Sequence, residues 1–276
     1  MNTHELTRPA VQQPPTLAAG IRLRELRARQ KISQLELAFR VGVSQRHLSC
    51  IETGKAAASR DMLVAILDGL EAPLKERNDT LVAAGFAPQF GQRPLNHAEM
   101  QSINQVIDMM LTAHNPCPAF VMDSVWNLVR FNEGVMRLFT VLEVDPSPLI
   151  ANPNMLEAML LPGNGILDCM INADEVRREV YGRAERDSSF VPELRPILQR
   201  IEKPESLHPR THHEPAKNEP VLVTRFRSRH GELKFMSTFT TFGTPMDITV
   251  ASLRIEHLFP ADEHTRKTME NACKPS

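Results

Sequence analysis

The sequence is poor in cysteine and in long apolar runs. Its 276 residues include four cysteines, Cys50, Cys117, Cys169 and Cys273, which lie far apart and form no C-x-x-C pair. This spacing argues against a disulfide framework or a zinc knuckle and favours reduced thiols, so we expect a cytoplasmic protein. No apolar run approaches the length that a bilayer-spanning helix needs.

Signatures of catalysis are also missing. The chain contains no G-x-S-x-G, P-loop, H-E-x-x-H or dinucleotide fingerprint. Histidines gather only in a proline-rich stretch, at His208, His212 and His213, with His230 further on. Adjacent histidines in such a loop seldom close a metal site. We therefore expect no enzyme activity, no catalytic residue, no metal and no cofactor.

Charge is balanced overall but unevenly distributed. The net charge is −1, yet residues 20–60 carry nine basic side chains against three acidic ones, which leaves −7 for the remainder. A basic segment on an otherwise acidic protein is typical of a surface that binds a polyanion, although a solvated helical face has the same composition.

The most informative segment is 32–55, ISQLELAFRVGVSQRHLSCIETGK. Ser33 and Glu36 form an S-x-x-E capping box, which predicts a helix start. Gly42 falls where the backbone needs a positive φ, and Ser44 caps a second helix. The pattern predicts two short helices joined by a tight turn. Leu48 and Ile51 face inward, and the outward positions of the second helix are polar.

Helices predicted around this motif complete a bundle. We expect a first helix over 17–29, a fourth over about 60–70 and a fifth from Pro73 to near Gly85. The stretch 88–96 has the Pro/Gly content of a linker. Residues 1–16 lack a signal-peptide pattern and are expected to form a disordered tail, and residues 271–276 are expected to form a C-terminal tail. The predicted domains are therefore 17–87 and 97–270.

The second domain mixes helices and strands. Apolar spacing predicts a helix over 97–113, strands over 119–122 and 125–131 joined by a turn at Asp123-Ser124, and a helix from Asn132 to about Leu142. Further helices are expected over 154–161, 167–186 and 191–201. After a polar loop at 202–220 come three strands, 221–227, 232–242 and 248–259. This order predicts an α+β domain with one antiparallel sheet and helices on one side.

These segments resemble a known family. Residues LRELRARQKISQLELAFRVGVSQRHLSCIETGK are similar to the lambda-repressor-type, or XRE-family, helix-turn-helix. The stretches APLKERNDTLVAAGFAP, PAFVMDSVWNLVRFNEG and FGTPMDITVASLRIEHLFPADEHT resemble MmyB-like regulators. The resemblance implies a five-helix DNA-binding bundle followed by a PAS-like ligand-binding domain. It also implies a homodimer that binds an inverted-repeat operator in double-stranded DNA, and an apolar ligand such as a fatty acid.

Candidate DNA contacts lie on the two central helices. Gln45 and Arg46 suit adenine and guanine edges. The resemblance implies that Gln34 contacts a phosphate and that Ser49 and Cys50 face the groove. Lys55 is expected to add affinity for the DNA backbone. The complete set is Gln34, Ser44, Gln45, Arg46, His47, Ser49, Cys50 and Lys55. The resemblance further implies that Arg27 and Glu52 form an ion pair between the first and third helices, with a structural role.

Candidate ligand contacts are the methionines and aromatics of the second domain. They are Met110, Trp126, Phe131, Met136, Phe139, Met159, Phe235 and Phe239. Methionine adapts to irregular apolar volumes, but the same residues also suit an ordinary core. Strand alternation would place Trp126, Leu128 and Arg130 on one face. Asn132 is expected to cap a helix rather than to bind a ligand.

Three functional hypotheses follow. The first is a transcription regulator, expected to be a repressor, whose second domain binds an apolar molecule and modulates operator binding. The second is a constitutive DNA binder in which that domain only dimerises or binds a protein. The third is a thiol sensor using Cys50, which lacks a neighbouring resolving cysteine.

Overall fold

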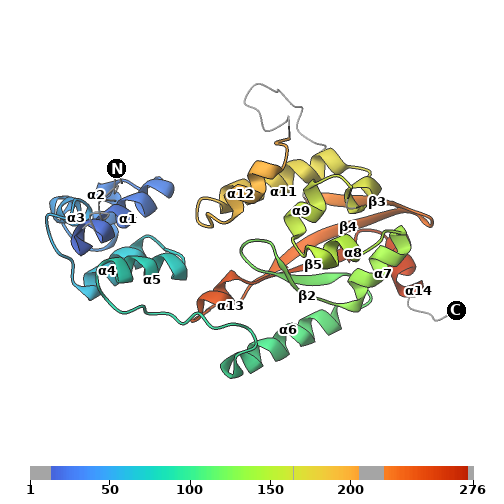
Figure 1. Cartoon of the computed structure of the whole chain (residues 1–276), viewed down its shortest axis with the longest axis horizontal. Helices are drawn as coiled ribbons and strands as arrows, with labels where there is room; N and C mark the ends of the chain where they lie inside the picture. Colours follow the sequence, from blue (N-terminus) through green and yellow to red (C-terminus); the bar gives the residue numbers. More distant parts are fainter. Residues whose placement is uncertain (1–13, 164, 205–220, 273–276) are drawn as a thin grey trace, which may run out of the picture. The chain divides into compact units, whose positions relative to one another are not determined.

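A computed structural model describes residues 14–163, 165–204 and 221–272 (Figure 1). The chain divides into two units: residues up to Gln92 with Met246–Ile248, and Arg93–Pro245 with the residues from Thr249 onward. Most of the predicted tails, and the 205–220 part of the polar loop with His208, His212 and His213, lie outside the described residues.

The N-terminal unit is the predicted five-helix bundle. Its helices are α1 (Pro15–Arg29), α2 (Gln34–Arg40), α3 (Gln45–Glu52), α4 (Arg60–Gly69) and α5 (Leu74–Ala83). The first helix begins two residues before the predicted start. One core joins all five helices, and it contains the side chains of Leu23, Leu26, Leu37, Leu48, Ile51, Leu63, Ile66, Leu67 and Leu81.

Local capping explains where these helices start. Ser33, Ser44 and Ser59 each accept a hydrogen bond from the backbone N–H three residues later, which confirms the two caps predicted at Ser33 and Ser44. Glu36 does not complete the capping box; its carboxylate accepts a bond from Arg40 Nε at 3.0 Å. Gly42, at φ +71°, makes the turn between α2 and α3.

The C-terminal unit combines a sheet with helices on both of its faces. Its first elements are η1 (Ala98–Met100), α6 (Gln101–Ala113), β1 (Ala119–Met122), β2 (Leu128–Phe131) and α7 (Glu133–Leu142). Next come α8 (Ser147–Ala151), α9 (Met155–Leu160), α10 (Ile166–Cys169), α11 (Ala173–Asp187) and α12 (Leu194–Arg200). The last are β3 (Val223–Ser228), β4 (Gly231–Thr240), α13 (Ile248–Ser252), β5 (Arg254–Pro260) and α14 (Glu263–Asn271).

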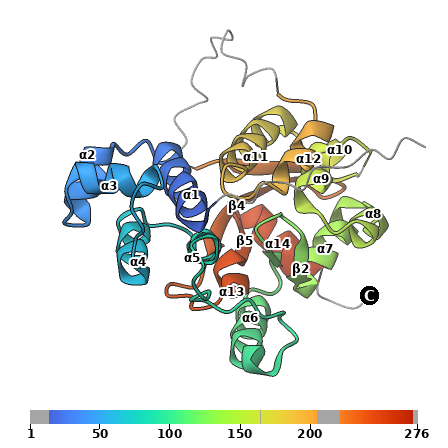
Figure 2. The ribbon, with the colours of Figure 1, turned by 60° about the vertical axis from the view of Figure 1, so that its left-hand side comes forward.

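The five strands form one antiparallel sheet in the order β2-β1-β5-β4-β3. Side chains alternate between its faces. Ala119, Val121 and Ile255 pack with Ile107 and Leu111 of α6 on one face. The neighbouring residues of the same strands face α7–α12 on the other face of the sheet. Figure 2 shows the sheet from a second direction. The prediction of helices on one side was therefore wrong, because α6 covers the second face.

The strand predicted over 125–131 begins only at Leu128. Asp123 accepts hydrogen bonds from the backbone N–H groups of Val125 and Asn127 and tightens a longer turn. Trp126 lies in this turn at φ +67°. A register shift in β1–β2 then puts Leu128 and Arg130 on opposite faces, so the predicted shared face was wrong.

Two other elements were predicted with the wrong extent. The helix over 167–186 is interrupted between α10 and α11, because Met170 pairs with Phe226 and the Ile171 N–H bonds to the Arg225 carbonyl. The segment 248–259, which was predicted as one strand, begins instead with the helix α13. Its β-branched residues favour a strand, but packing overrides that preference. Helices α8 and α14 were not predicted.

Candidate nucleic-acid interface and ligand cavity

The α2–turn–α3 pair has the geometry of a helix-turn-helix. Leu48 and Ile51 of α3 are buried, whereas Gln45, Arg46 and His47 on its first turn are exposed. Ser44 and Lys55 are also exposed, and Ser49 and Cys50 are half-buried on the following turn. The buried residues fix the angle of α3 against the bundle, which leaves a polar face available for the major groove.

A charged cluster joins α1, α2 and α3. Arg27 donates from Nε to Glu52 Oε1 at 2.7 Å and from Nη2 to Oε2 at 2.8 Å. Gln34 Nε2 donates to the same Oε2 at 2.8 Å. Glu52 is only 2% exposed. This is the ion pair that the resemblance implies, and it engages the Gln34 side-chain amide that was predicted to contact a phosphate.

The environment of Glu52 favours its charged form. Burial raises the pKa of this carboxyl, but the hydrogen bonds from Arg27 and Gln34 and the charges of Arg27 and Arg24 outweigh it, so its pKa lies below the ordinary value. The hydrogen bond to Glu52 in turn raises the pKa of Arg27. The cluster is thus a charged contact that holds α1, α2 and α3 together.

The C-terminal unit contains a partly open cavity between its sheet and its helices. The cavity has a volume of about 70 Å³, enough for several water molecules or part of a small ligand. Its wall combines sheet residues with residues of α7–α10, and most of its side chains are apolar: Pro118, Phe120, Leu128, Val135, Leu138, Phe139, Leu149, Met155, Met159, Ile166, Met170, Phe226 and Leu258.

Of the predicted ligand contacts, Phe139 and Met159 line this cavity. The other six do not belong to its described wall. Met110 packs in the cluster on the opposite face of the sheet. Trp126 is 2% exposed within the core, and its Nε1 has no partner among the described residues.

The remaining four lie elsewhere for different reasons. Phe131 and Phe239 are 40% and 36% exposed. Phe235 is fully buried in the core cluster between α7, α14 and the sheet. Met136 is half-buried on α7, one turn before Phe139. Spacing alone could not separate core from cavity, because both need the same apolar side chains.

Sequence reasoning missed the polar groups of the wall. Among the described lining residues, Thr224, Ser237 and Glu256 carry polar side chains. Glu256 lies on β5 beside Leu258, and strand alternation in RIEHLF would have placed both on one face. An acidic side chain two positions before Leu258, on the same face of the strand, was the available signal.

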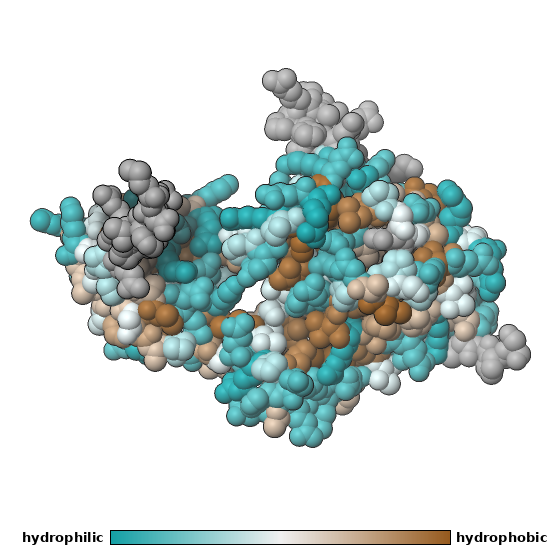
Figure 3. Space-filling view, viewed as in Figure 1, coloured by the Kyte–Doolittle hydropathy of each residue, from teal (hydrophilic) through white to brown (hydrophobic). Residues whose placement is uncertain are grey.

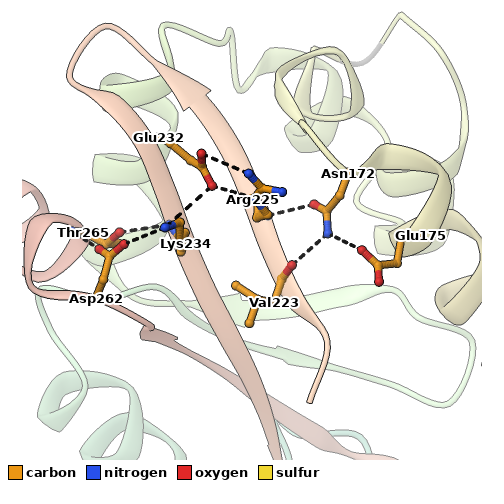
Figure 4. A network of polar contacts seen from close by, with 8 residues as sticks. All are labelled: Asn172, Glu175, Val223, Arg225, Glu232, Lys234, Asp262 and Thr265. Carbon is orange, nitrogen blue, oxygen red and sulfur yellow. Dashed lines mark hydrogen bonds and ion pairs between the residues drawn. The ribbon is translucent and has the colours of Figure 1, made fainter. Parts of the chain in front are cut away.

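A polar network holds the cavity's outer strand in place (Figure 4). Asn172 donates from Nδ2 to the Val223 carbonyl at 2.8 Å and accepts from the Arg225 N–H at 2.9 Å, one residue on either side of Thr224. Arg225 bonds in turn to Glu232 of β4, and Lys234 pairs with Asp262. The network fixes β3 against the helical layer.

Other functional centres find no counterpart in the described structure. Within residues 14–163, 165–204 and 221–272, no group of three or more His, Cys, Asp or Glu side chains is placed to hold a metal ion. In the same residues, no helix has the length and apolar character needed to cross a membrane.

A helix-turn-helix with a polar recognition helix, joined to a unit that contains an apolar cavity, defines a DNA-binding regulator with a ligand-binding domain. Comparison with protein families agrees. Residues 18–79 match the helix-turn-helix domain, and residues 103–272 match the MmyB-like transcription regulator ligand binding domain. Because the second match covers more than half of the sequence, the chain belongs to the MmyB-like transcription regulators. The family is one of regulators rather than of enzymes.

Solved structures also show similarity. A crystal structure of the clp gene regulator ClgR from Corynebacterium glutamicum is 29% identical over 28% of this chain and 92% of that chain, with a TM-score of 0.24. The restriction-modification controller protein C.AhdI from Aeromonas hydrophila is 29% identical over 22% of this chain and 94% of that chain, with a TM-score of 0.22. No curated protein matches the chain.

Proposed function

We propose that this regulator acts in the cytoplasm as a homodimeric repressor that places α3 of each protomer in the major groove of an inverted-repeat operator. The observation that carries the proposal is the exposed first turn of α3 with Gln45 and Arg46. The buried side chains of the same helix fix its position in the bundle. Each half-site would lie about 34 Å from the next, one turn of the duplex.

The contacts divide between bases and backbone. Gln45 and Arg46 read base edges, with Ser49 and Cys50 beside them on the next turn. Ser44, His47 and Lys55 add contacts to the phosphates. Gln34 remains a phosphate contact through the N-terminus of α2 rather than through its amide nitrogen, which is bonded to Glu52.

Replacing Arg46 by alanine should weaken binding to the cognate operator by about 1–3 kcal/mol and relax the preference at one base position. The operator is first selected from a random duplex library. Gel retardation then measures the affinities of wild type and variant for that site and for each single-base derivative. Binding should also weaken steeply with salt, because basic side chains displace condensed counterions.

Lys267→Ala is the matched control, since it removes an exposed cation from α14 in the other unit. It should leave operator affinity unchanged. Equal losses for Arg46→Ala on all sequences would make Arg46 a phosphate contact. Sequence-selective retardation by a Gln45→Ala, Arg46→Ala double variant would refute the proposed reading surface.

The cavity supports a second part of the proposal, that an apolar small molecule binds in the C-terminal unit and modulates operator binding. Its largely apolar wall and its place between the sheet and the helical layer suit such a ligand. A ligand can change the arrangement of the two N-terminal units of the dimer only if it binds the DNA-competent and the incompetent arrangement with unequal affinity.

An alternative role for the C-terminal unit is dimerisation or protein binding alone. Exposed apolar side chains favour it: Phe131, Ile150 and Phe259 are among the large ones. In Figure 3, hydrophobic residues of this unit form patches among hydrophilic ones. Organic extraction of the purified protein followed by mass spectrometry separates the two roles. We expect a stoichiometric apolar compound, and its absence together with unaltered dimerisation would favour the alternative.

A further inference from the structure

Glu256 is a buried acid in the wall of an otherwise apolar cavity. It is 7% exposed, and in the sheet it lies between Phe120 of β1 and Phe239 of β4. Thirteen of the sixteen lining residues are apolar, and the described polar ones besides Glu256 are Thr224 and Ser237. An acid in this position costs folding free energy, because a carboxyl loses its hydration there.

Among the described residues, Ser237 forms a hydrogen bond with Glu256, and Arg183 places a positive charge near it. Burial raises the pKa of this carboxyl, while the hydrogen bond to Ser237 and the charge of Arg183 act in the opposite direction. The Arg183 guanidinium lies over the ring of Phe239, 4.3 Å from its centroid. Because Phe239 is the register partner of Glu256, the two side chains lie on the same face of the sheet, and the positive charge of Arg183 is close to the acid.

We propose that Glu256 and Ser237 form the polar recognition point of the cavity, and that its ligand is an apolar chain carrying an uncharged hydroxyl group. This inference rests on the proposed ligand-binding function. It adds the chemical class of the ligand and the residues that select it.

A hydroxyl group suits this point whether Glu256 is ionised or protonated. It donates to a carboxylate and accepts from a carboxylic acid, and its remaining capacity can bond to Ser237. A carboxylate ligand would bring a second acidic group against Glu256 in a poorly hydrated space. An ammonium ligand would lose its hydration in the cavity and would meet the field of Arg183. The neutral head group avoids both costs.

The experiment compares three probes that share one chain: 1-octanol, octanoate and octylamine. Calorimetric titration of the full-length protein, first stripped of bound lipid, gives the three dissociation constants. We expect 1-octanol to bind about ten-fold more tightly than either charged probe. Glu256→Gln should retain the affinity for 1-octanol, because an amide keeps a donor and an acceptor at this point.

Glu256→Leu should lose the preference, bringing 1-octanol within about two-fold of octanoate. Met110→Leu, an apolar exchange on the opposite face of the sheet and outside the described wall, is the matched control and should keep the wild-type order. Circular dichroism verifies that each variant is folded. Comparison of Glu256→Gln with Glu256→Leu separates an effect on polar recognition from an effect on packing.

The possible failures are distinguishable. If wild type binds octanoate as tightly as 1-octanol, or if Glu256→Leu keeps the wild-type preference, the inference is overturned while a ligand-binding domain remains. If none of the probes binds to wild type and extraction yields no compound, the ligand-binding function itself is overturned, and the inference with it.

Discussion

Replacing Glu52 by alanine should destabilise the N-terminal unit by about 3 kcal/mol, because it removes one partner of a buried ion pair and leaves the other. Of its contacts within the described part of the chain, Arg27 would keep the bond to the Ile32 carbonyl, and Gln34 would lose the acceptor of its side-chain amide. The value lies at the lower end for such pairs, since Arg27 retains partial contact with water. A loss of this size corresponds to a fall in melting temperature of about 12–24 °C for a domain of this length.

The position of the single tryptophan makes this loss measurable in the full chain. Trp126 belongs to the C-terminal unit, so its fluorescence follows that unit, whereas calorimetry and circular dichroism follow both. Glu52→Ala should shift the calorimetric transition and leave the tryptophan transition in place. Glu25→Ala, an exposed acid on α1, is the control and should change stability by less than about 0.5 kcal/mol.

Operator binding should weaken in Glu52→Ala only as far as the bundle unfolds. An unchanged melting transition combined with lost binding would instead make Glu52 a direct contributor to DNA recognition. Measurements below the melting temperature of the variant separate the two cases, because the folded fraction is then known from circular dichroism.

The contribution of Glu52 should depend on pH in one direction. Its folded pKa lies below the ordinary value of 4.5, so its stabilisation is present above that pH and is lost as the pH falls through the folded value. Glu52→Gln removes the titration. The difference in melting temperature between wild type and Glu52→Gln should therefore shrink below about pH 4.5, and a constant difference would contradict the assignment.

The N-terminal unit could be predicted closely because its determinants are local. Ser33, Ser44 and Ser59 each bond within one turn, and Gly42 needs only its own backbone freedom. Leu48 and Ile51 follow the helical period and are buried where that period places them. Sequence could not show that Gln34 bonds to Glu52, since their approach depends on the packing of α2 against α3.

The C-terminal unit was predicted in outline, and its errors have non-local causes. The interruption before α11 depends on pairing with β3, which is more than fifty residues away along the chain. Trp126 was assigned to a strand because nothing in its residue type predicts the positive φ of +67° that it adopts in the turn. Cavity residues were harder still, since Phe139 lines the cavity whereas Phe235 is core with the same chemistry.

Asn132 illustrates how a predicted cap can have a wider structural role. Its Oδ1 accepts from the N–H groups of Val135 and Ala119, and its Nδ2 donates to the carbonyls of Leu111 and Cys117. The side chain is buried and joins the start of α7 to β1 and to the end of α6. Asparagine alone among the common capping residues supplies two acceptor and two donor bonds at once.

Asn132→Asp should therefore destabilise the C-terminal unit by about 3 kcal/mol or more, although aspartate is an equally good helix cap. The second carboxylate oxygen would replace Nδ2 and face two carbonyl oxygens in a buried site. Urea unfolding followed by Trp126 fluorescence measures the loss, and calorimetry should show the N-terminal transition unchanged.

Asn271→Asp, at the exposed end of α14, is the matched control for this substitution and should change the midpoint little. If Asn132→Asp kept the wild-type midpoint, the donor bonds would carry no net stability and Asn132 would be a simple cap. If it kept the midpoint but lost the binding of apolar probes, Asn132 would belong to the ligand site, even though it lies outside the described wall of the cavity.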